Sequence, residues 1–193
     1  RDWSVTGVQT CALPIFKTAS LDGFIATEDD SLDWLFRHDQ PGPEEKDYDR
    51  FLRRIRTVVM GRATYDFIAN EPSPWAYGNQ RVIVVTSQPI EDPKGPLETR
   101  SDIDALIAEL RALDDGDVWM LGGGRLQMAF MERGALDEIQ IFLIPEIIGG
   151  GRPLFPPTGL EAGLTLLAAE KTPEGFARLH YAFNRAPKDE PSA

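Results

Sequence analysis

Short β-branched runs alternate with segments of helical spacing along most of this chain. The strand-like runs are 57–60, 81–86 and 118–121, and apolar residues three or four positions apart fill the stretches between them. Buried strands that alternate with amphipathic helices are typical of a mostly parallel sheet covered by helices. The pattern therefore predicts an α/β fold.

The C-terminal third of the chain adds a different pattern. Segments 164–169 and 177–183 follow each other closely and are expected to form a closing antiparallel pair. The predicted helices are 48–55, 61–67, 102–113 and 125–133, and a further buried strand is predicted over 139–144.

Composition and charge restrict the class of protein. The chain has 193 residues, 42% hydrophobic and 26% charged, which fits one globular domain. A net charge of −11 argues against nucleic acid or an anionic membrane surface as the main partner. No apolar run approaches the roughly 18 residues of a membrane span, so we expect a soluble protein. Its one cysteine, Cys11, cannot form an internal disulfide, and we therefore expect a cytoplasmic location.

Both ends of the chain are expected to lie outside the native domain. Residues 5–15 resemble the conceptual translation of a widely used sequencing adapter, so residues 1–15 are predicted to be non-native. The polar, proline-rich residues 185–193 are predicted to form a disordered tail. The native domain is then predicted to span residues 16–184.

Three consecutive glycines, Gly122 to Gly124, stand between a predicted strand and a predicted helix. Glycine lets the backbone come close to a ligand, and the free N–H groups at a helix start favour an anion. A tight turn without a ligand is the alternative for such a run. The run does not match the dinucleotide fingerprint, because Gln127 occupies the position of its third glycine, and no Walker lysine follows.

Two other predicted strands end in residues of the same kind. The first is followed by Gly61 to Thr64 and the second by Thr86 and Ser87. Ligands of open α/β sheets bind outside the carboxyl ends of the strands. Helix N-termini, hydroxyl groups and two arginines, Arg62 and Arg125, at this edge suit a dinucleotide with several phosphates.

Several short motifs in a fixed order carry a family resemblance. They are Ser20-Leu-Asp-Gly23, Asp33-Trp34-Leu35, Val59-Met-Gly-Arg-Ala-Thr-Tyr65, Val84-Val-Thr-Ser87, Leu121-Gly-Gly-Gly124, Leu136-Asp-Glu138 and Pro145-Glu-Ile-Ile-Gly-Gly-Gly-Arg-Pro-Leu-Phe155. Over residues 16–184 the chain resembles the dihydrofolate reductase superfamily, in the branch that contains the reductase (C-terminal) domain of the riboflavin-biosynthesis protein RibD. The resemblance implies a single-domain, three-layer α/β fold with a mostly parallel central sheet and a C-terminal antiparallel hairpin.

The resemblance also implies NADPH as the cofactor. Gln88 stands where many dihydrofolate reductases have a basic residue for the extra phosphate of NADPH, so NADH stays open as an alternative. Trp34 is interpreted as a cofactor contact or as a packing residue. The cofactor-binding residues implied are Ala19 near the nicotinamide, Gly61, Arg62, Ala63 and Thr64 at the phosphates, Thr86, Ser87 and Gln88 at the adenosine side, and Gly122, Gly123, Gly124, Arg125 and Leu126 at the pyrophosphate.

The resemblance to dihydrofolate reductases also implies a carboxylate that holds the substrate and helps to protonate it. Asp47 and Asp39 are both candidates, and we favour Asp47 because a helix holds a side chain more firmly than a loop. Riboflavin-type reductases place a glutamate just before the glycine loop, whereas this chain has Met120 and Leu121 there. No metal site is predicted, because His38 and His180 lack ligand spacing.

The expected function is hydride transfer from NADPH to a pterin-like or pyrimidine-like heterocycle, similar to that of 5-amino-6-(5-phosphoribosylamino)uracil reductases. The alternative is a nucleotide-binding protein of the same fold without turnover. The expected partners are a small heterocyclic substrate and a second copy of the chain, because members of this branch often pair through a sheet edge.

Overall fold

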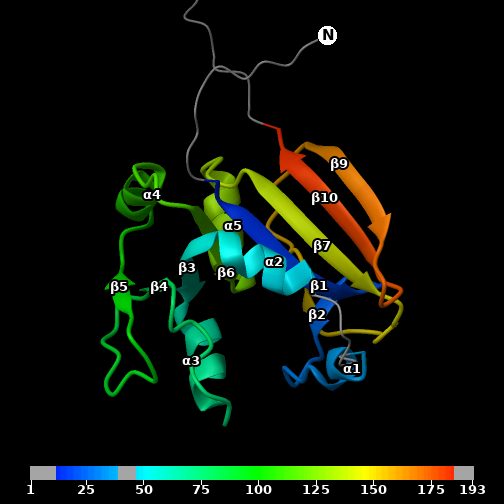
Figure 1. Ribbon diagram of the computed structural model, residues 1–193, viewed down its shortest axis with the longest axis horizontal. Coiled ribbons are helices and arrows are strands. Elements are labelled where there is room, and N and C mark those ends of the chain that lie inside the picture. The colour runs from blue at the N-terminus through cyan, green and yellow to red at the C-terminus, as the bar shows by residue number, and fades with distance from the viewer. Residues whose placement is uncertain (1–11, 39–46, 185–193) are drawn as a thin grey trace, which may run out of the picture.

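Strands and helices alternate along the residues that the computed structural model describes, 12–38 and 47–184 (Figure 1). The helices are α1 (Asp33–Phe36), α2 (Asp47–Arg54), α3 (Arg62–Asn70), α4 (Ile103–Arg111) and α5 (Gly124–Glu132). The strands are β1 (Pro14–Ser20), β2 (Phe24–Ala26), β3 (Ile55–Gly61), β4 (Arg81–Val85), β5 (Glu98–Arg100), β6 (Asp117–Gly122), β7 (Glu138–Ile144), β8 (Arg152–Pro153), β9 (Leu164–Lys171) and β10 (Ala177–Phe183).

The main strands form two four-stranded sheets that lie side by side. One has the order β5-β4-β3-β6 and is parallel throughout, and the other has the order β1-β7-β10-β9. In the second sheet, β1 and β7 are parallel, whereas β10 runs antiparallel to both β7 and β9. The predicted α/β fold, with a mostly parallel arrangement and a C-terminal antiparallel hairpin, is confirmed.

The two sheets meet where β1 lies against β6. The Val118 N–H donates to the Ala12 carbonyl at 2.9 Å near the start of both strands. Towards their carboxyl ends the contact is made by a side chain, because Lys17 Nζ donates to the Leu121 carbonyl at 2.7 Å. The regular ladder is thus interrupted between β1 and β6.

Alternating side chains of the central strands enter two hydrophobic cores, one on each face. Val59, Ile83 and Met120 pack on the face covered by α4 and α5. Their sequence neighbours, including Val58, pack on the face covered by α2 and α3, where Phe51 and Tyr65 are buried. This period of two is the ordinary consequence of strand geometry and explains the three layers.

One predicted boundary is wrong. Ile55 was expected to be the last apolar residue of the helix 48–55, but α2 ends at Arg54 and Ile55 begins β3. Ile55 is fully buried and pairs with Asp117 of β6, so sheet pairing overrides the helical spacing at this residue. The short strands β5 and β8 were not predicted.

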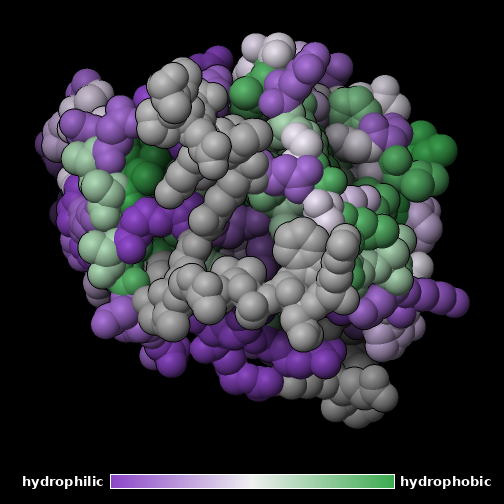
Figure 2. Space-filling view, turned by 90° about the horizontal axis from the view of Figure 1, so that it is seen from above, coloured by the Kyte–Doolittle hydropathy of each residue, from purple (hydrophilic) through white to green (hydrophobic). Residues whose placement is uncertain are grey.

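The exposed hydrophobic residues concentrate on the edge strand β9. Leu164, Leu166 and Leu167 have exposed fractions of 37%, 53% and 50%. In the space-filling view, hydrophobic side chains gather on the side where β9 lies (Figure 2). None of the helices within residues 12–38 and 47–184 has the length and apolar character to cross a bilayer.

The start of β1 belongs to the segment that the sequence marks as adapter-derived. Leu13 and Ile15 are fully buried in the core below α5. The Leu13 N–H also donates to the Asp137 carboxylate at 2.9 Å. These residues fill core positions whatever their origin, and the non-native origin of residues 1–15 stays a hypothesis. Residues 1–11 and the predicted disordered tail, 185–193, lie outside the described residues.

We expect Ile15→Ala to lower the free energy of unfolding by about 2–5 kcal/mol, because it removes buried methyl groups and leaves a cavity. Ile147→Ala is the matched control, since Ile147 is 71% exposed, and it should change stability by no more than about 0.5 kcal/mol. Urea denaturation measures both. Equal effects of the two substitutions would contradict the packing of β1.

Candidate functional site

Two parallel strands, β3 and β6, end next to each other. Met60 of β3 pairs with Gly122 of β6, after a register shift between Val59 and Met60, so both strands reach the same sheet edge. An added Cβ at Gly61 would lie 3.7 Å from the Gly123 nitrogen and 3.9 Å from the Gly122 carbonyl oxygen. The two glycine turns predicted to bind phosphates are therefore in contact.

Each of these turns opens a helix whose first N–H groups have no side-chain cap. Gly61 is the N-cap of α3 and Gly123 is the N-cap of α5, and both residues have extended backbone conformations. Uncapped N–H groups, together with the helix dipole, favour a negatively charged ligand. By contrast, Asp102 caps α4 with its carboxylate, which accepts from the Ala105 N–H at 2.9 Å.

The glycine loop of β6 and α5 leaves no room for side chains. A Cβ at Gly122 would lie 2.7 Å from Lys17 Nζ, and Gly122 also has a φ of +124°. A Cβ at Gly123 would lie 3.1 Å from Thr64 Oγ1. Thr64, predicted at the phosphates, thus lies beside the loop of Gly122 to Gly124. This loop presents bare backbone to a ligand.

Lys17 was not predicted as a site residue. It is partly buried in β1, and burial lowers the pKa of its ammonium group to about 8. Its Nζ donates to the Leu121 carbonyl, and no carboxylate within the described residues forms an ion pair with it. Its place beside Gly122 depends on tertiary packing, because 104 residues separate Lys17 from Leu121.

Gln127 is a second polar residue that was not predicted to lie in the site. It lies in the first turns of α5, where its backbone N–H donates to the Gly123 carbonyl at 3.0 Å. Its side chain is fully buried, yet within the described part of the chain neither the amide nitrogen nor the amide oxygen has a hydrogen-bond partner. A buried amide without partners is costly, and a polar ligand group would satisfy it.

The predicted adenosine-side loop lies near the start of α3. Arg62 Nη1 donates to the Pro89 carbonyl at 3.0 Å, just past Gln88, and Arg62 Nε pairs with Asp66 at 2.7 Å. Thr86 Oγ1 accepts from the Gln88 N–H at 3.0 Å, which shapes this loop. Arg62 is therefore partly neutralised, while the loop brings its exposed polar groups to the same edge.

The other predicted cofactor residues differ in exposure. Ala63, Ser87 and Arg125 are exposed, whereas Leu126 is buried. Ala19 is fully buried in the core, and Trp34 of α1 is 3% exposed, with no partner for its indole N–H among the residues that the structure describes. The short helix α1 is not among the helices predicted from the sequence.

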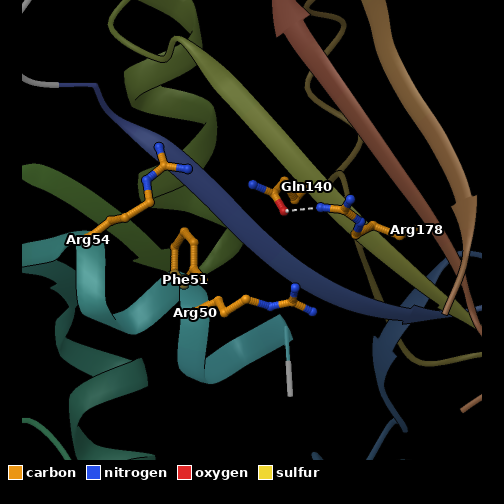
Figure 3. Close-up of a pocket in the computed structure, with 5 residues that line it drawn as sticks. All are labelled: Arg50, Phe51, Arg54, Gln140 and Arg178. Atoms are coloured by element: carbon orange, nitrogen blue, oxygen red, sulfur yellow. Dashed lines mark hydrogen bonds between the residues drawn. The ribbon is translucent and has the colours of Figure 1, made fainter. Parts of the chain in front are cut away.

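A pocket opens on the α2 side of the sheet. It is lined by Phe51 and Gln140 and by three arginines, Arg50, Arg54 and Arg178 (Figure 3). Arg54 pairs with Asp117 at 2.6 Å, and Arg178 pairs with Glu170 at 2.5 Å. Arg178 Nη1 also donates to Gln140 Oε1 at 3.4 Å, across the pocket floor formed by β7 and β10.

Sequence reasoning missed the polar residues of this pocket. The signal that was available is the spacing of Arg50, Arg53 and Arg54 on the helix that contains Asp47. Asp47 is the first residue of α2 but its side chain is not among those described, and its alternative, Asp39, lies outside the described residues. The role of either carboxylate stays a prediction.

The second glycine run, 149–151, has a structural role. The Asp22 carboxylate accepts from the N–H groups of Ile148 and Gly149, at 3.3 and 2.8 Å. A Cβ at Gly151 would collide with the Ala26 carbonyl oxygen at 2.0 Å. This run therefore holds the turn between β1 and β2 against the loop before β8.

The histidines bind carboxylates in the described part of the chain. His38 Nε2 lies 2.9 Å from Glu146 Oε1, and His180 Nε2 lies 3.0 Å from Glu138 Oε2. Residues 12–38 and 47–184 contain no cluster of three potential metal ligands.

The arrangement agrees with comparisons with known proteins. Residues 13–177 match the model of the RibD C-terminal domain family. The chain belongs to this family.

Relatives of this RibD C-terminal domain protein agree in sequence and in fold. YwjB of Bacillus subtilis, itself uncharacterized, is 30% identical over 168 residues, which cover 86% of this chain and 95% of YwjB. A crystal structure of a Shewanella sp. PV-4 protein ascribed to riboflavin biosynthesis has 27% identity and a TM-score of 0.78, with 90% of this chain and 99% of that one covered.

The fold also extends to dihydrofolate reductases. The enzyme of Enterococcus faecalis, solved as a complex with NADP(H), is 20% identical, with a TM-score of 0.59 and coverage of 92% of this chain and 98% of that one. The dihydrofolate reductase-like fold inferred from the sequence motifs is therefore confirmed.

We expect Gly123→Ala to weaken binding of NADPH at least tenfold, a loss of about 1.4 kcal/mol. The added methyl group would lie 3.1 Å from Thr64 Oγ1, between the two helix N-termini, while the backbone φ of −73° suits alanine. Fluorescence titration with NADPH measures the dissociation constant. Gly78→Ala is the control, since a Cβ there meets nothing within 4 Å. Equal affinities of the two variants would mean that the ligand does not use this loop.

Proposed function

We propose that this protein is an NADPH-dependent reductase that transfers a hydride to a pyrimidine-like or pterin-like heterocycle. The observation that carries the proposal is the contact between the glycine turns of β3 and β6, each at the uncapped start of a helix. Two such helix starts at one sheet edge suit the two phosphates of a dinucleotide. The complex of the E. faecalis reductase with NADP(H), on the same fold, supports this choice of cofactor.

Named residues would hold the cofactor in distinct ways. The N–H groups that follow Gly61 and Gly123 would bind the phosphates, and Thr64 would add a hydroxyl donor. Arg125, Ser87 and Gln88 are exposed and Thr86 is half-buried, and these residues would bind the outer, adenosine part. The bound nucleotide would supply the hydride. Because Gln88 is a neutral donor, we propose a preference for NADPH that leaves NADH usable.

The pocket on the α2 side is the proposed substrate site. Phe51 contributes an aromatic side chain to the pocket wall, and Gln140 offers both a donor and an acceptor to the polar edge of a flat ring. Three arginines around the pocket favour a substrate that carries an anionic group, such as a phosphorylated pyrimidine. Similarity to a protein ascribed to riboflavin biosynthesis supports this substrate class.

The chain's own contribution to the reaction is positioning and the exclusion of water. The side chain of Phe16 in β1 packs on Phe51, with ring centroids 4.6 Å apart, and on Phe142 of β7 at 4.7 Å. These rings make an apolar floor beside the pocket. Asp47, at the start of α2, is the proposed carboxylate that orients the heterocycle or relays a proton from water to it.

We also propose a homodimer formed through the β9 edge. β9 is eight residues long and ends its sheet, no other strand of the described residues pairs with its outer edge, and it carries the exposed leucines Leu164, Leu166 and Leu167. Such an edge favours pairing with a second strand, and a twofold axis would pair β9 with its own copy. Light scattering should therefore give a mass of about twice 21.5 kDa. A monomer at micromolar concentration would contradict this proposal.

The proposed activity is tested by following nicotinamide absorbance with NADPH and two substrates, dihydrofolate and 5-amino-6-(5-phosphoribosylamino)uracil. We expect turnover, and faster turnover with the phosphorylated pyrimidine. Arg50→Met should raise the KM for that substrate at least tenfold with little change in kcat, because a pocket cation is lost. Arg56→Met, which removes an exposed arginine that does not line the pocket, is the matched control.

The other outcomes are equally informative. Tight NADPH binding without turnover of either substrate would favour a nucleotide-binding protein of the same fold. Failure to bind NADPH or NADH would overturn the proposed function. Equal KM values for the Arg50 and Arg56 variants would remove the α2 pocket from the substrate site.

A further inference from the structure

Lys17 lies at the gap between the two sheets, beside the glycine loop. Its Nζ reaches across to the Leu121 carbonyl at 2.7 Å, at the end of β6. The same Nζ is 2.7 Å from the position that a Cβ on Gly122 would occupy. The ammonium group is therefore directly against the loop that opens α5.

Lys17 faces away from the α2 pocket. Its neighbour Phe16 packs on Phe51 of α2, so alternation along β1 turns Lys17 to the opposite face. Ile15 and Ala19, which share that face, belong to the core that includes Leu126 and Phe130 of α5. A group on this side cannot be the proton donor to a substrate bound beside Phe51, but it can meet a ligand held by the start of α5.

The charge of Lys17 is not balanced by the elements packed around it. Asp117 of β6 and Glu138 of β7 lie at the opposite ends of their strands and bind Arg54 and His180. In α5 the first turn carries Arg125, and Glu132 ends the helix. Arg62 and Asp66 of α3 pair with each other. Burial alone lowers the pKa of Lys17 to about 8, with no contribution from a neighbouring charge.

We propose that Lys17 is a cofactor-positioning residue whose ammonium group provides the counter-charge for the diphosphate of the bound dinucleotide. This inference rests on the proposed function. The ammonium group and the uncapped N–H groups of α5 converge on the Gly122–Gly123 segment, so their positive potentials add at one place. Lys17 Nζ has three N–H donors, and one of them is used by Leu121.

A purely structural role is the competing explanation, because Lys17 also links β1 to β6. The two roles differ in their dependence on pH. The diphosphate binds the protonated lysine better, so cofactor affinity is complete below pH 8 and falls as the pH rises through the pKa of free Lys17. A structural link would change stability and leave the pH profile of the dissociation constant unaltered.

The test is a fluorescence titration with NADPH at pH 7 and at pH 9.5, for the full chain and three variants. Loss of a charge-assisted contact is expected to weaken binding by about tenfold to a hundredfold. The wild-type protein should therefore bind at least tenfold more weakly at pH 9.5 than at pH 7. Lys17→Met should bind weakly at both pH values, with a flat profile.

Two variants separate charge from folding. Lys17→Arg keeps its charge at both pH values, so it should bind more tightly than Lys17→Met and show a flat profile. Lys171→Met removes an exposed lysine of β9 and should keep the wild-type profile. Unfolding curves of all variants at both pH values report any change in stability separately from binding.

Titration with 2′-phospho-ADP-ribose, which lacks the nicotinamide, locates the contact. An equal loss for this ligand and for NADPH in Lys17→Met supports a contact with the diphosphate, whereas a loss confined to NADPH overturns it. Wild-type binding without pH dependence, or unchanged binding in Lys17→Met, overturns the role of Lys17 and leaves the proposed function standing. No NADPH binding by the wild-type protein overturns the proposed function as well.

Discussion

The pairing of β3 with β6 is the constraint on which the candidate site depends. Met60 pairs with Gly122, so both strands end at one edge, and each is followed at once by a helix. The residues that hold this pair are apolar and buried on both faces, as in Val58, Val59 and Met120. Because the paired strands are packed by apolar side chains on both faces, they hold the N-termini of α3 and α5 side by side.

Neighbouring side chains of β1 lie on opposite faces of the sheet. Phe16 packs toward α2 and the arginine-lined pocket, while Lys17 points toward the glycine loop of α5. Neighbouring positions of one strand thus serve the proposed substrate side and the proposed cofactor side. A shift of β1 by one residue would exchange these side chains, so the register between β1 and β7 governs both sides of the site.

The fold and the glycine turns that end β3 and β6 could be predicted from the sequence, whereas the residues of the arginine-lined pocket could not. Strands such as 81–85 and the turns at Gly61 and Gly122 are local features, marked by β-branched runs and by glycine before a helix. Lys17, Arg178 and Gln140 gave no local signal. Lys17 contacts Leu121, which is 104 positions away in the sequence. Arg178 contacts Gln140 only because β10 pairs with β7. Ile55 did give a local signal, but the signal was misleading: its helical spacing predicted a helix, whereas the residue pairs in a strand.

The proposed function requires a dinucleotide to bind across the carboxyl ends of β3 and β6. The most direct measurement is a crystal structure of the protein with NADPH. We predict that the diphosphate lies against the backbone N–H groups of Gly123, Gly124 and Thr64, with the adenosine toward Thr86. A nucleotide bound elsewhere, with the glycine turns of α3 and α5 free of it, would contradict the account.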